Sequence, residues 1–206
     1  MRTGIVLVAA LLIQAPGFKP AQVASAPLPL LPPNVVGWTE ALLDVEISAS
    51  GAVVRATPLR ASPSFADHVA ASVAGWRFSP AMDGDRPVES RALVAAVFRP
   101  PQLFGGPAAG SPAQEQAPPS DAIPFPVAQV QPPHPPGVIS DGVVLVELLV
   151  GPDGSVGQAR LVGGGAGFEE AALSTARGWR FRAALREGRP VPAYAYLIFG
   201  FRAPLV

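Results

Sequence analysis

Few side chains in this chain of 206 residues are of types that carry out chemistry. The absence of Cys excludes a thiol nucleophile, a thiolate zinc site, an iron–sulfur cluster and a disulfide framework. Only two His are present, His68 and His134, so little material is available for acid–base catalysis or for binding a metal. We therefore expect a protein that is not an enzyme, with no catalytic residue, no cofactor and no metal.

The overall composition narrows the class of protein further. Hydrophobic residues make up 49% of the chain, and 15 basic residues balance 15 acidic ones. This much apolar side chain with no net charge argues against disorder throughout the chain. Without a basic excess to neutralise phosphates, nucleic acid is not an expected partner.

The N-terminus has the layout of a secretory signal. Arg2 precedes an uncharged apolar run from Gly4 to Ile13, which is too short to span a bilayer as a helix. Small residues suitable for cleavage lie at Ala24-Ser25-Ala26 and, earlier, at Ala15. We assign residues 1–26 as a signal peptide or a short N-terminal anchor. The expected location is the periplasm; the alternative is an uncleaved protein anchored in the inner membrane and facing the periplasm, with that segment as its only membrane contact.

The rest of the chain contains an internal duplication. With an offset of 103 residues, 19 of the 68 pairs between 32–99 and 135–202 are identical, without a gap. The repeated stretches are Gly75-Trp76-Arg77-Phe78 with Gly178-Trp179-Arg180-Phe181, and Arg86-Pro87-Val88 with Arg189-Pro190-Val191. We predict two domains over 32–99 and 135–202. Between them, the Pro-, Gly- and Ala-rich segment 100–134 has the composition of an extended linker.

Each copy predicts the element order strand–strand–helix–strand. Alternating apolar residues around 41–47 and the apolar run 143–150 are typical of strands. Ser50-Gly51 and Pro152-Asp153-Gly154 then predict hairpin turns. A helix with an apolar face follows in each copy, and the last strands are expected at about 88–99 and 191–202. The fold class is α+β: two small domains, each a three-stranded antiparallel sheet with one packed helix.

Units of this size must rely on large aromatic residues for their cores. In the first copy Ser64-x-x-Asp67 predicts a capping box, and Phe65 begins the apolar face of the helix. The residues expected to form the two cores are Phe65, Trp76, Phe78, Phe98, Phe168, Trp179, Phe181 and Phe201.

The second copy resembles a known family over residues 132–202. It contains, in order, the turn Pro152-Asp153-Gly154, a helix that ends in Gly178-Trp179-Arg180-Phe181, and Gly188-Arg189-Pro190-Val191 before a strand that ends at Phe201. This pattern is similar to the C-terminal domain family of TonB, the periplasmic end of the energy transducer that serves outer-membrane transporters. The first copy, 32–99, resembles the family less closely.

The resemblance implies that partners bind by adding an extended peptide to the edge of the sheet. It places that edge on the last strand of the second copy, and the candidate partner-binding residues are Val191, Tyr194, Tyr196 and Ile198. The alternative interpretation is that this is a core strand, since alternation alone does not show which face meets the helix. Outer-membrane receptor peptides or other envelope proteins are the implied partners, and the same edge would allow a homodimer.

Two hypotheses for the function remain open at this stage. One is a role in outer-membrane transport or energy transduction, as a divergent transducer or an adaptor. The other is a non-energised envelope scaffold or assembly protein that uses the same domains. The Pro-rich segment lies between the two copies rather than before them, so it does not connect a domain to a membrane anchor.

Overall fold

The structure of the protein is a computed structural model that describes residues 17–31, 39–61, 63–98, 120–165 and 167–203. The apolar run from Gly4 to Ile13 and residues 100–119 of the predicted linker lie outside the described residues. Neither helix in the described part of the chain is long and apolar enough to cross a membrane.

Both copies have the predicted order of long elements. The first unit consists of β3 (Thr39–Ile47), β4 (Val53–Ala61), α1 (Pro63–Val73) and β8 (Ser90–Phe98). The second unit consists of β10 (Gly142–Val150), β11 (Val156–Gly164), α2 (Glu169–Arg177) and β15 (Ala193–Phe201). Short strands fill the segments between each helix and the last strand: β5 (Arg77–Ser79), β6 (Ala81–Asp83), β7 (Arg86–Val88), β12 (Arg180–Arg182), β13 (Ala184–Arg186) and β14 (Arg189–Val191).

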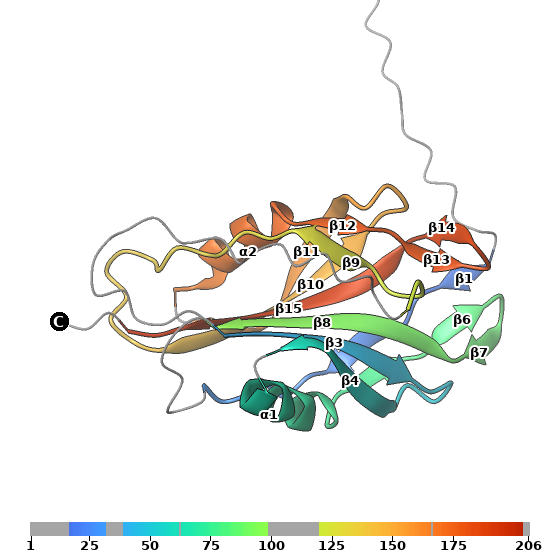
Figure 1. Cartoon of the computed structure of the whole chain (residues 1–206), viewed down its shortest axis with the longest axis horizontal. Coiled ribbons are helices and arrows are strands. Elements are labelled where there is room, and N and C mark those ends of the chain that lie inside the picture. Colours follow the sequence, from blue (N-terminus) through green and yellow to red (C-terminus); the bar gives the residue numbers. More distant parts are fainter. Residues whose placement is uncertain (1–16, 32–38, 62, 99–119, 166, 204–206) are drawn as a thin grey trace, which may run out of the picture.

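The two units share one sheet, which differs from the predicted pair of separate three-stranded sheets. The six long strands form a single sheet in the order β11-β10-β15-β8-β3-β4. The last strands of the two units, β15 and β8, lie side by side and pair in parallel at its centre (Figure 1). All other pairs of neighbours in this sheet are antiparallel. The two units are thus halves of one continuous sheet.

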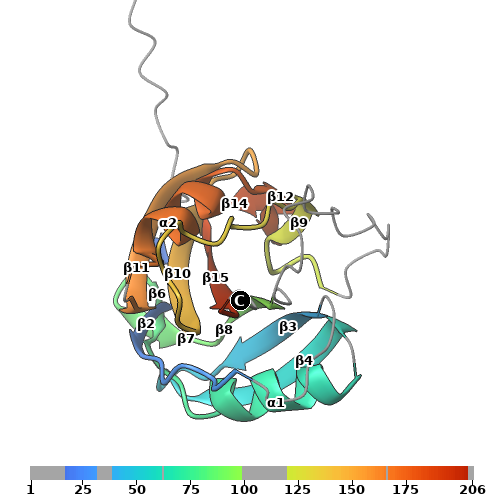
Figure 2. The ribbon, with the colours of Figure 1, turned by 90° about the vertical axis from the view of Figure 1, so that its left-hand side faces the viewer.

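The helices α1 and α2 lie on opposite faces of this sheet (Figures 1 and 2). The same edge strand of each unit meets at the joint, and the two strands run in parallel, so one unit is turned over relative to the other about an axis along the strands. Side chains of β8 and β15 consequently contribute to both hydrophobic clusters, one under each helix. Each face of the sheet is therefore buried along its centre.

All eight aromatic residues expected in the cores are at most 5% exposed. Equivalent residues make equivalent contacts: the ring centroids of Phe65 and Phe98 are 4.8 Å apart, and those of Phe168 and Phe201 are 4.5 Å apart. The two Trp side chains are completely buried, each next to the Phe that follows it by two residues. Aromatic residues account for half of the twelve largest fully buried side chains.

The repeat extends further toward the N-terminus than the predicted units. The short strand β2 (Gln22–Ser25) pairs with β5, and β9 (Phe125–Ala128) pairs with β12, again at an offset of 103 residues. The indole N–H of Trp76 donates to the carbonyl of Pro27, and that of Trp179 donates to the carbonyl of Val130. Each unit therefore begins with an extended arm, over 17–31 in the first unit and 120–134 in the second.

The two arms correct the predicted domain bounds. Residues 120–134 have a linker-like composition, yet Ile123 and Phe125 are buried in the core around α2. In the first arm Ala21 and Val23 are buried, and β1 (Phe18–Lys19) pairs with β6. Cleavage after Ala26 would remove all of these contacts, whereas cleavage at Ala15 would leave every described residue in place.

Glycine is required at the turn of each long hairpin. Gly51 has a φ angle of 82° and Gly154 one of 77°, a region that other residues rarely adopt. A Cβ atom on Gly51 would lie 1.9 Å from the carbonyl oxygen of Phe78, and one on Gly154 would lie 1.8 Å from that of Phe181. Both turns thus lie directly against the strand that follows the buried Trp.

The two helices begin differently from each other. Helix α1 begins at Pro63, so Ser64 lies inside its first turn and the predicted capping box is wrong. Proline suits this first position because its missing N–H would have no partner there. Helix α2 carries Glu169 and Glu170 in its first turn, as expected from the helix dipole. Its N-cap residue is Phe168, whose side chain makes no capping hydrogen bond.

Candidate functional site

The strand that was expected to form the docking edge lies inside the sheet. Along its whole length β15 pairs with β10, and Ala195 to Gly200 also pair with Leu93 to Phe98 of β8. The predicted edge is therefore wrong for this fold, because the first unit occupies it. Its backbone groups from Ala195 to Gly200 already have partners on both sides.

The four predicted partner-binding residues are accordingly not an exposed row. Tyr196 and Ile198 are fully buried, and they pack in the cluster under α1 rather than under the helix of their own unit. Tyr194 packs at the margin of the same cluster, with its ring centroid 6.3 Å from that of Tyr196. Only Val191 lines an open cavity, which is described below.

Tyr196 joins the second unit to the arm of the first. Its hydroxyl accepts a hydrogen bond from the backbone N–H of Val23, at 2.9 Å. Burial and the nearby negative charge of Glu147 raise the pKa of Tyr196 far above its usual value. The same two causes raise the pKa of Tyr194. Both phenols are therefore neutral, which suits a structural contact and not proton transfer.

A glycine allows the two units to meet closely. Gly200 lies opposite Phe98 in the parallel ladder, and a Cβ atom on Gly200 would lie 1.4 Å from the nearest ring atom. The ring of Phe98 is itself buried against Phe65, so it has little room to move. The absence of a side chain at this position is thus a requirement of the joint between the units.

The outer edges of the shared sheet are β4 and β11. Strand β4 contains Pro58, which has no N–H to offer to an added strand and is exposed. Arg55, which is exposed, and Arg60 lie on the same strand, and charges of this kind also discourage edge pairing. The edge at β4 is therefore poorly suited to accept a partner strand.

Strand β11 lacks the proline of β4, and its one charged residue, Arg160, is bonded to Glu147. It contains no proline, and within the described residues it pairs only with β10. Gly157 and Gln158 are exposed near its beginning, whereas Gly163 near its end lies against the side chain of Leu28 from the first arm. The accessible strand edge of the second unit is thus the first part of β11, on the opposite side from the predicted one.

Each unit carries a buried carboxylate on the sheet face turned away from its own helix. Glu147 in β10 is 3% exposed and Asp44, at the equivalent position in β3, is 2% exposed. Arg160 donates two hydrogen bonds to Glu147, and Arg91 donates one to Asp44 and one to Glu46. Burial raises the pKa of Asp44, while the charge of Arg91 acts in the opposite direction. In each unit the arginine thus compensates the charge of a carboxylate that the other unit covers.

The arms provide part of that cover. The side-chain amide of Gln22, in the first arm, donates to Glu147 of the second unit. In return, Gln129 of the second arm donates to Glu40 of the first unit. Each unit thus donates a hydrogen bond to a carboxylate of the other unit. No group of three potential metal ligands occurs in the described part of the chain.

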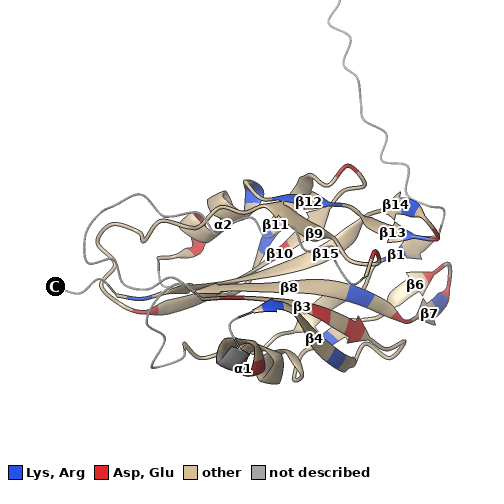
Figure 3. Ribbon diagram, viewed as in Figure 1, with Lys and Arg blue, Asp and Glu red and all other residues tan. Residues whose placement is uncertain are grey.

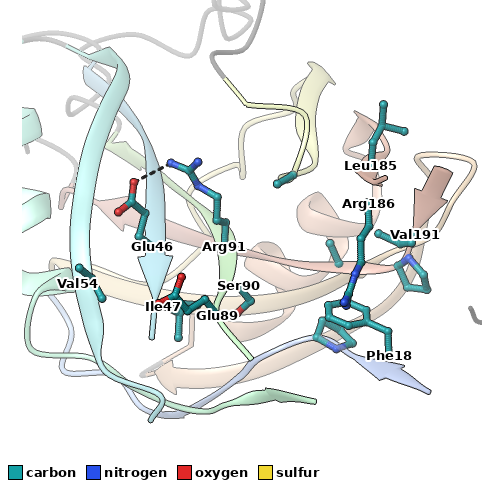
Figure 4. Close-up of a pocket in the computed structure, with 14 residues that line it drawn as sticks. Phe18, Glu46, Ile47, Val54, Glu89, Ser90, Arg91, Leu185, Arg186 and Val191 are labelled. Atoms are coloured by element: carbon teal, nitrogen blue, oxygen red, sulfur yellow. Dashed lines mark hydrogen bonds and ion pairs between the residues drawn. The ribbon is translucent and has the colours of Figure 1, made fainter. Parts of the chain in front are cut away.

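An open cleft of about 600 Å³ lies where the two central strands separate (Figure 4). Its walls come from both units and from the first arm; they include Phe18, Ile47, Val54, Leu185 and Val191. Four charged residues also line it: Glu46, Glu89, Arg91 and Arg186. Figure 3 shows charges of both signs in this part of the molecule, around β6, β7, β13 and β14.

Comparison with known protein families gives a match within the second unit. Residues 140–203 match the family model described as Gram-negative bacterial TonB protein C-terminal. A domain of this family is a protein-interaction domain and not an enzyme, and its members function in the Gram-negative envelope. The match covers one copy only, so the assignment of the first copy remains a prediction. No curated protein and no solved structure gives a significant match.

Sequence reasoning missed the arms and the cleft. The arms left almost no signal in the sequence, because between 17–31 and 120–134, at the same offset of 103 residues, only Pro29 and Pro132 are identical. The cleft had none, since it forms between parts of the chain that only the shared sheet brings together.

Proposed function

We propose that this protein is a periplasmic partner-binding protein in outer-membrane transport or energy transduction, and that it binds partner peptides through a sheet edge. The family match of residues 140–203 supports the process, since domains of this family bind outer-membrane receptors and other envelope proteins. The observation that carries the site is the outer edge of β11, which contains no proline and pairs only with β10 in the described part of the chain. Pairing with β8 leaves β15 unable to serve as this edge.

A partner strand would align along the first part of β11. Between Val156 and Arg160 the strand has a free side, and three of its five residues are exposed. Main-chain hydrogen bonds would give the affinity, and exposed side chains such as Gln158 would favour particular partners. The edge at β4, with Pro58, would not compete for the same peptide.

The second candidate function is a non-energised envelope scaffold. It is favoured by the parallel joint between β8 and β15, in which the two units already use sheet edges to assemble with each other. A scaffold would use β11 in the same way, to pair with another envelope protein or with a second copy of the chain. Both candidates depend on the same edge and differ in the partner.

Photo-crosslinking from β11 separates these candidates. A photoreactive residue in place of Gly157, which is exposed and has room for a side chain, would capture the partner of the edge in the full-length protein in its own cells. Capture of an outer-membrane receptor supports transport, and capture of another envelope protein or a second copy supports the scaffold. Absence of any crosslink dependent on light would overturn both.

Proline substitutions then test whether main-chain pairing is the cause. From Gln158 to Leu161 the pairing with β10 is regular, and adjacent N–H groups point to opposite sides, so only one of Gln158→Pro and Ala159→Pro removes a bond to β10. The other leaves the free energy of unfolding nearly unchanged and removes an N–H from the free edge. We expect this second variant to lose the crosslink and the uptake dependent on the receptor. Pro58→Ala, on β4, is the matched control and should change neither.

A further inference from the structure

The two central strands of the sheet separate at one end. The parallel ladder begins at Leu93 and Ala195, although β8 starts at Ser90 and β15 at Ala193. Ser90 to Ala92 pair with β3 only, and Ala193 and Tyr194 pair with β10 only. Figure 1 shows β8 turning toward β7 while β15 turns toward β14. Two short backbone edges therefore face each other across a gap.

The cleft of about 600 Å³ occupies this gap. Ser90 and Arg91 of one strand and Ala193 of the other line it, together with Val191 and Pro192 just before β15. Its volume lies in the range of sites that hold small ligands, and such sites often form between domains. The hydroxyl of Ser90 is buried and has no hydrogen-bond partner among the described residues. This oxygen is closed to the cleft, so the hydroxyl of Ser90 is not available to a ligand.

The charges around the cleft favour a basic ligand. Arg91 is neutralised by Asp44 and Glu46, and Arg186 by Asp83, at 2.7 Å. Arg186 also lies over the ring of Phe18, 4.3 Å from its centroid. Glu89, in contrast, is exposed and makes no ion pair within the described part of the chain. Both arginines are thus engaged, and Glu89 is the charge left to attract a ligand of opposite sign.

We propose that this cleft binds a short extended peptide segment that carries one Lys or Arg between apolar residues. The peptide main chain would pair with the edge of β8 at Ser90 and Arg91, its apolar side chains would contact Val54 and Val191, and its basic side chain would meet Glu89. This site is separate from the edge of β11. It would let one molecule hold two partner segments at once.

The test uses the full-length protein and two labelled pentapeptides, Thr-Val-Arg-Val-Thr and Thr-Val-Glu-Val-Thr, in fluorescence anisotropy titrations. We expect saturable binding of the Arg peptide and at least threefold weaker binding of the Glu peptide. Methylation of the peptide backbone nitrogens should also weaken binding, because it removes the donors needed for strand pairing. No saturable binding of the Arg peptide, or equal binding of the Arg and Glu peptides, would overturn the proposal.

Two pairs of variants locate the peptide. Ala122 is exposed and lines the cleft, so Ala122→Trp should fill the cleft and abolish binding. Val127→Trp, at an exposed position outside the lining, is its control and should bind as the wild type does. Glu89→Arg should weaken binding of the Arg peptide about threefold or more, whereas Glu170→Arg, on the exposed side of α2, should not.

These outcomes are independent of the proposed function. Binding that is unchanged by Ala122→Trp would show that the peptide binds elsewhere and would contradict the proposed cleft site. Binding that is lost instead in the proline variant that removes an N–H from the free edge of β11 would show that the peptide uses the other site. All variants should keep the thermal stability of the wild type, because the substituted side chains are exposed.

Discussion

The two units of this protein have the same element order, yet their outer strands differ. Strand β4 of the first unit carries the exposed Pro58, while the equivalent position in β11 is Leu161 and that strand contains no proline. Positions that hold the interior together, such as Trp76 and Trp179, are identical in the two copies. The two copies thus share the buried Trp of the core and differ in the proline of the outer strand, which affects whether a partner strand can pair there.

The largest test of this comparison concerns the two buried Trp residues. We expect Trp76→Ala and Trp179→Ala each to lower the free energy of unfolding by about 3–5 kcal/mol. Because both hydrophobic clusters contain residues of both units, either change should destabilise the whole sheet. With Trp38 replaced by Phe, the fluorescence of the remaining Trp reports on the unchanged unit during denaturant titration. A transition of that Trp at the wild-type midpoint would show that the units are independent.

A smaller change in the free energy of unfolding should distinguish a substitution at the centre of the sheet from one at its edge. Gly200→Ala places a methyl group against the ring of Phe98, and we expect a loss of about 1–3 kcal/mol. Gly157 is also in a strand, but its nearest neighbour, the carbonyl oxygen of Leu149, would be 3.7 Å from a Cβ atom. Gly157→Ala should therefore be neutral or stabilise by up to about 1 kcal/mol. Chemical denaturation measures both, and equal losses would contradict a tight central joint.

The smallest effects are in the pH dependence of stability. Burial raises the pKa of Asp44 in the folded protein, so the folded state holds this proton more tightly than the unfolded state does. The contribution of Asp44 to stability is then greatest at low pH and decreases as the pH rises through its raised pKa. Relative to the wild type, Asp44→Asn should become more stable between pH 3 and pH 6.

Asp153, in the hairpin turn of the second unit, should show the opposite sign. Hydrogen bonds from the hydroxyl and the backbone N–H of Ser155 lower its pKa in the folded protein. Its contribution is present above the unfolded pKa and is lost as the pH falls through the lowered one. Asp153→Asn should therefore lose stability relative to the wild type at pH 6 and approach it at acid pH. Thermal unfolding at several pH values measures both variants, and slopes of the same sign would contradict this assignment.

Much of each unit could be predicted from local patterns. The hairpin turns at Gly51 and Gly154, the buried faces of the helices and the order of the long elements follow from periodicity and turn residues. The capping box at Ser64 was wrong, because Pro63 begins the helix one position earlier. Residues 120–134 were assigned to a linker because composition alone does not reveal one short strand, β9. The carbonyl of Val130, just after this strand, accepts a hydrogen bond from Trp179.

The docking edge is where local reasoning failed. The alternation of Tyr194, Tyr196 and Ile198 with Leu197 and Phe199 described a strand with two apolar faces, which is compatible with an edge or a centre. Pairing between strands far apart in sequence depends on backbone groups that every residue has, so side-chain patterns do not specify it. The register of β8 and β15 depends in addition on the close fit of Gly200 and Phe98.

The repeat and the periodicity of the sequence were enough to predict a duplicated α+β unit that large aromatic residues stabilise. Those features are local, since they depend on spacing and residue type along one unit. Only the tertiary structure decided that the two units merge into one sheet, that β15 is covered and β11 is open, and that a cleft forms between them. Each of these follows from contacts between residues about 100 positions apart, which no local pattern encodes.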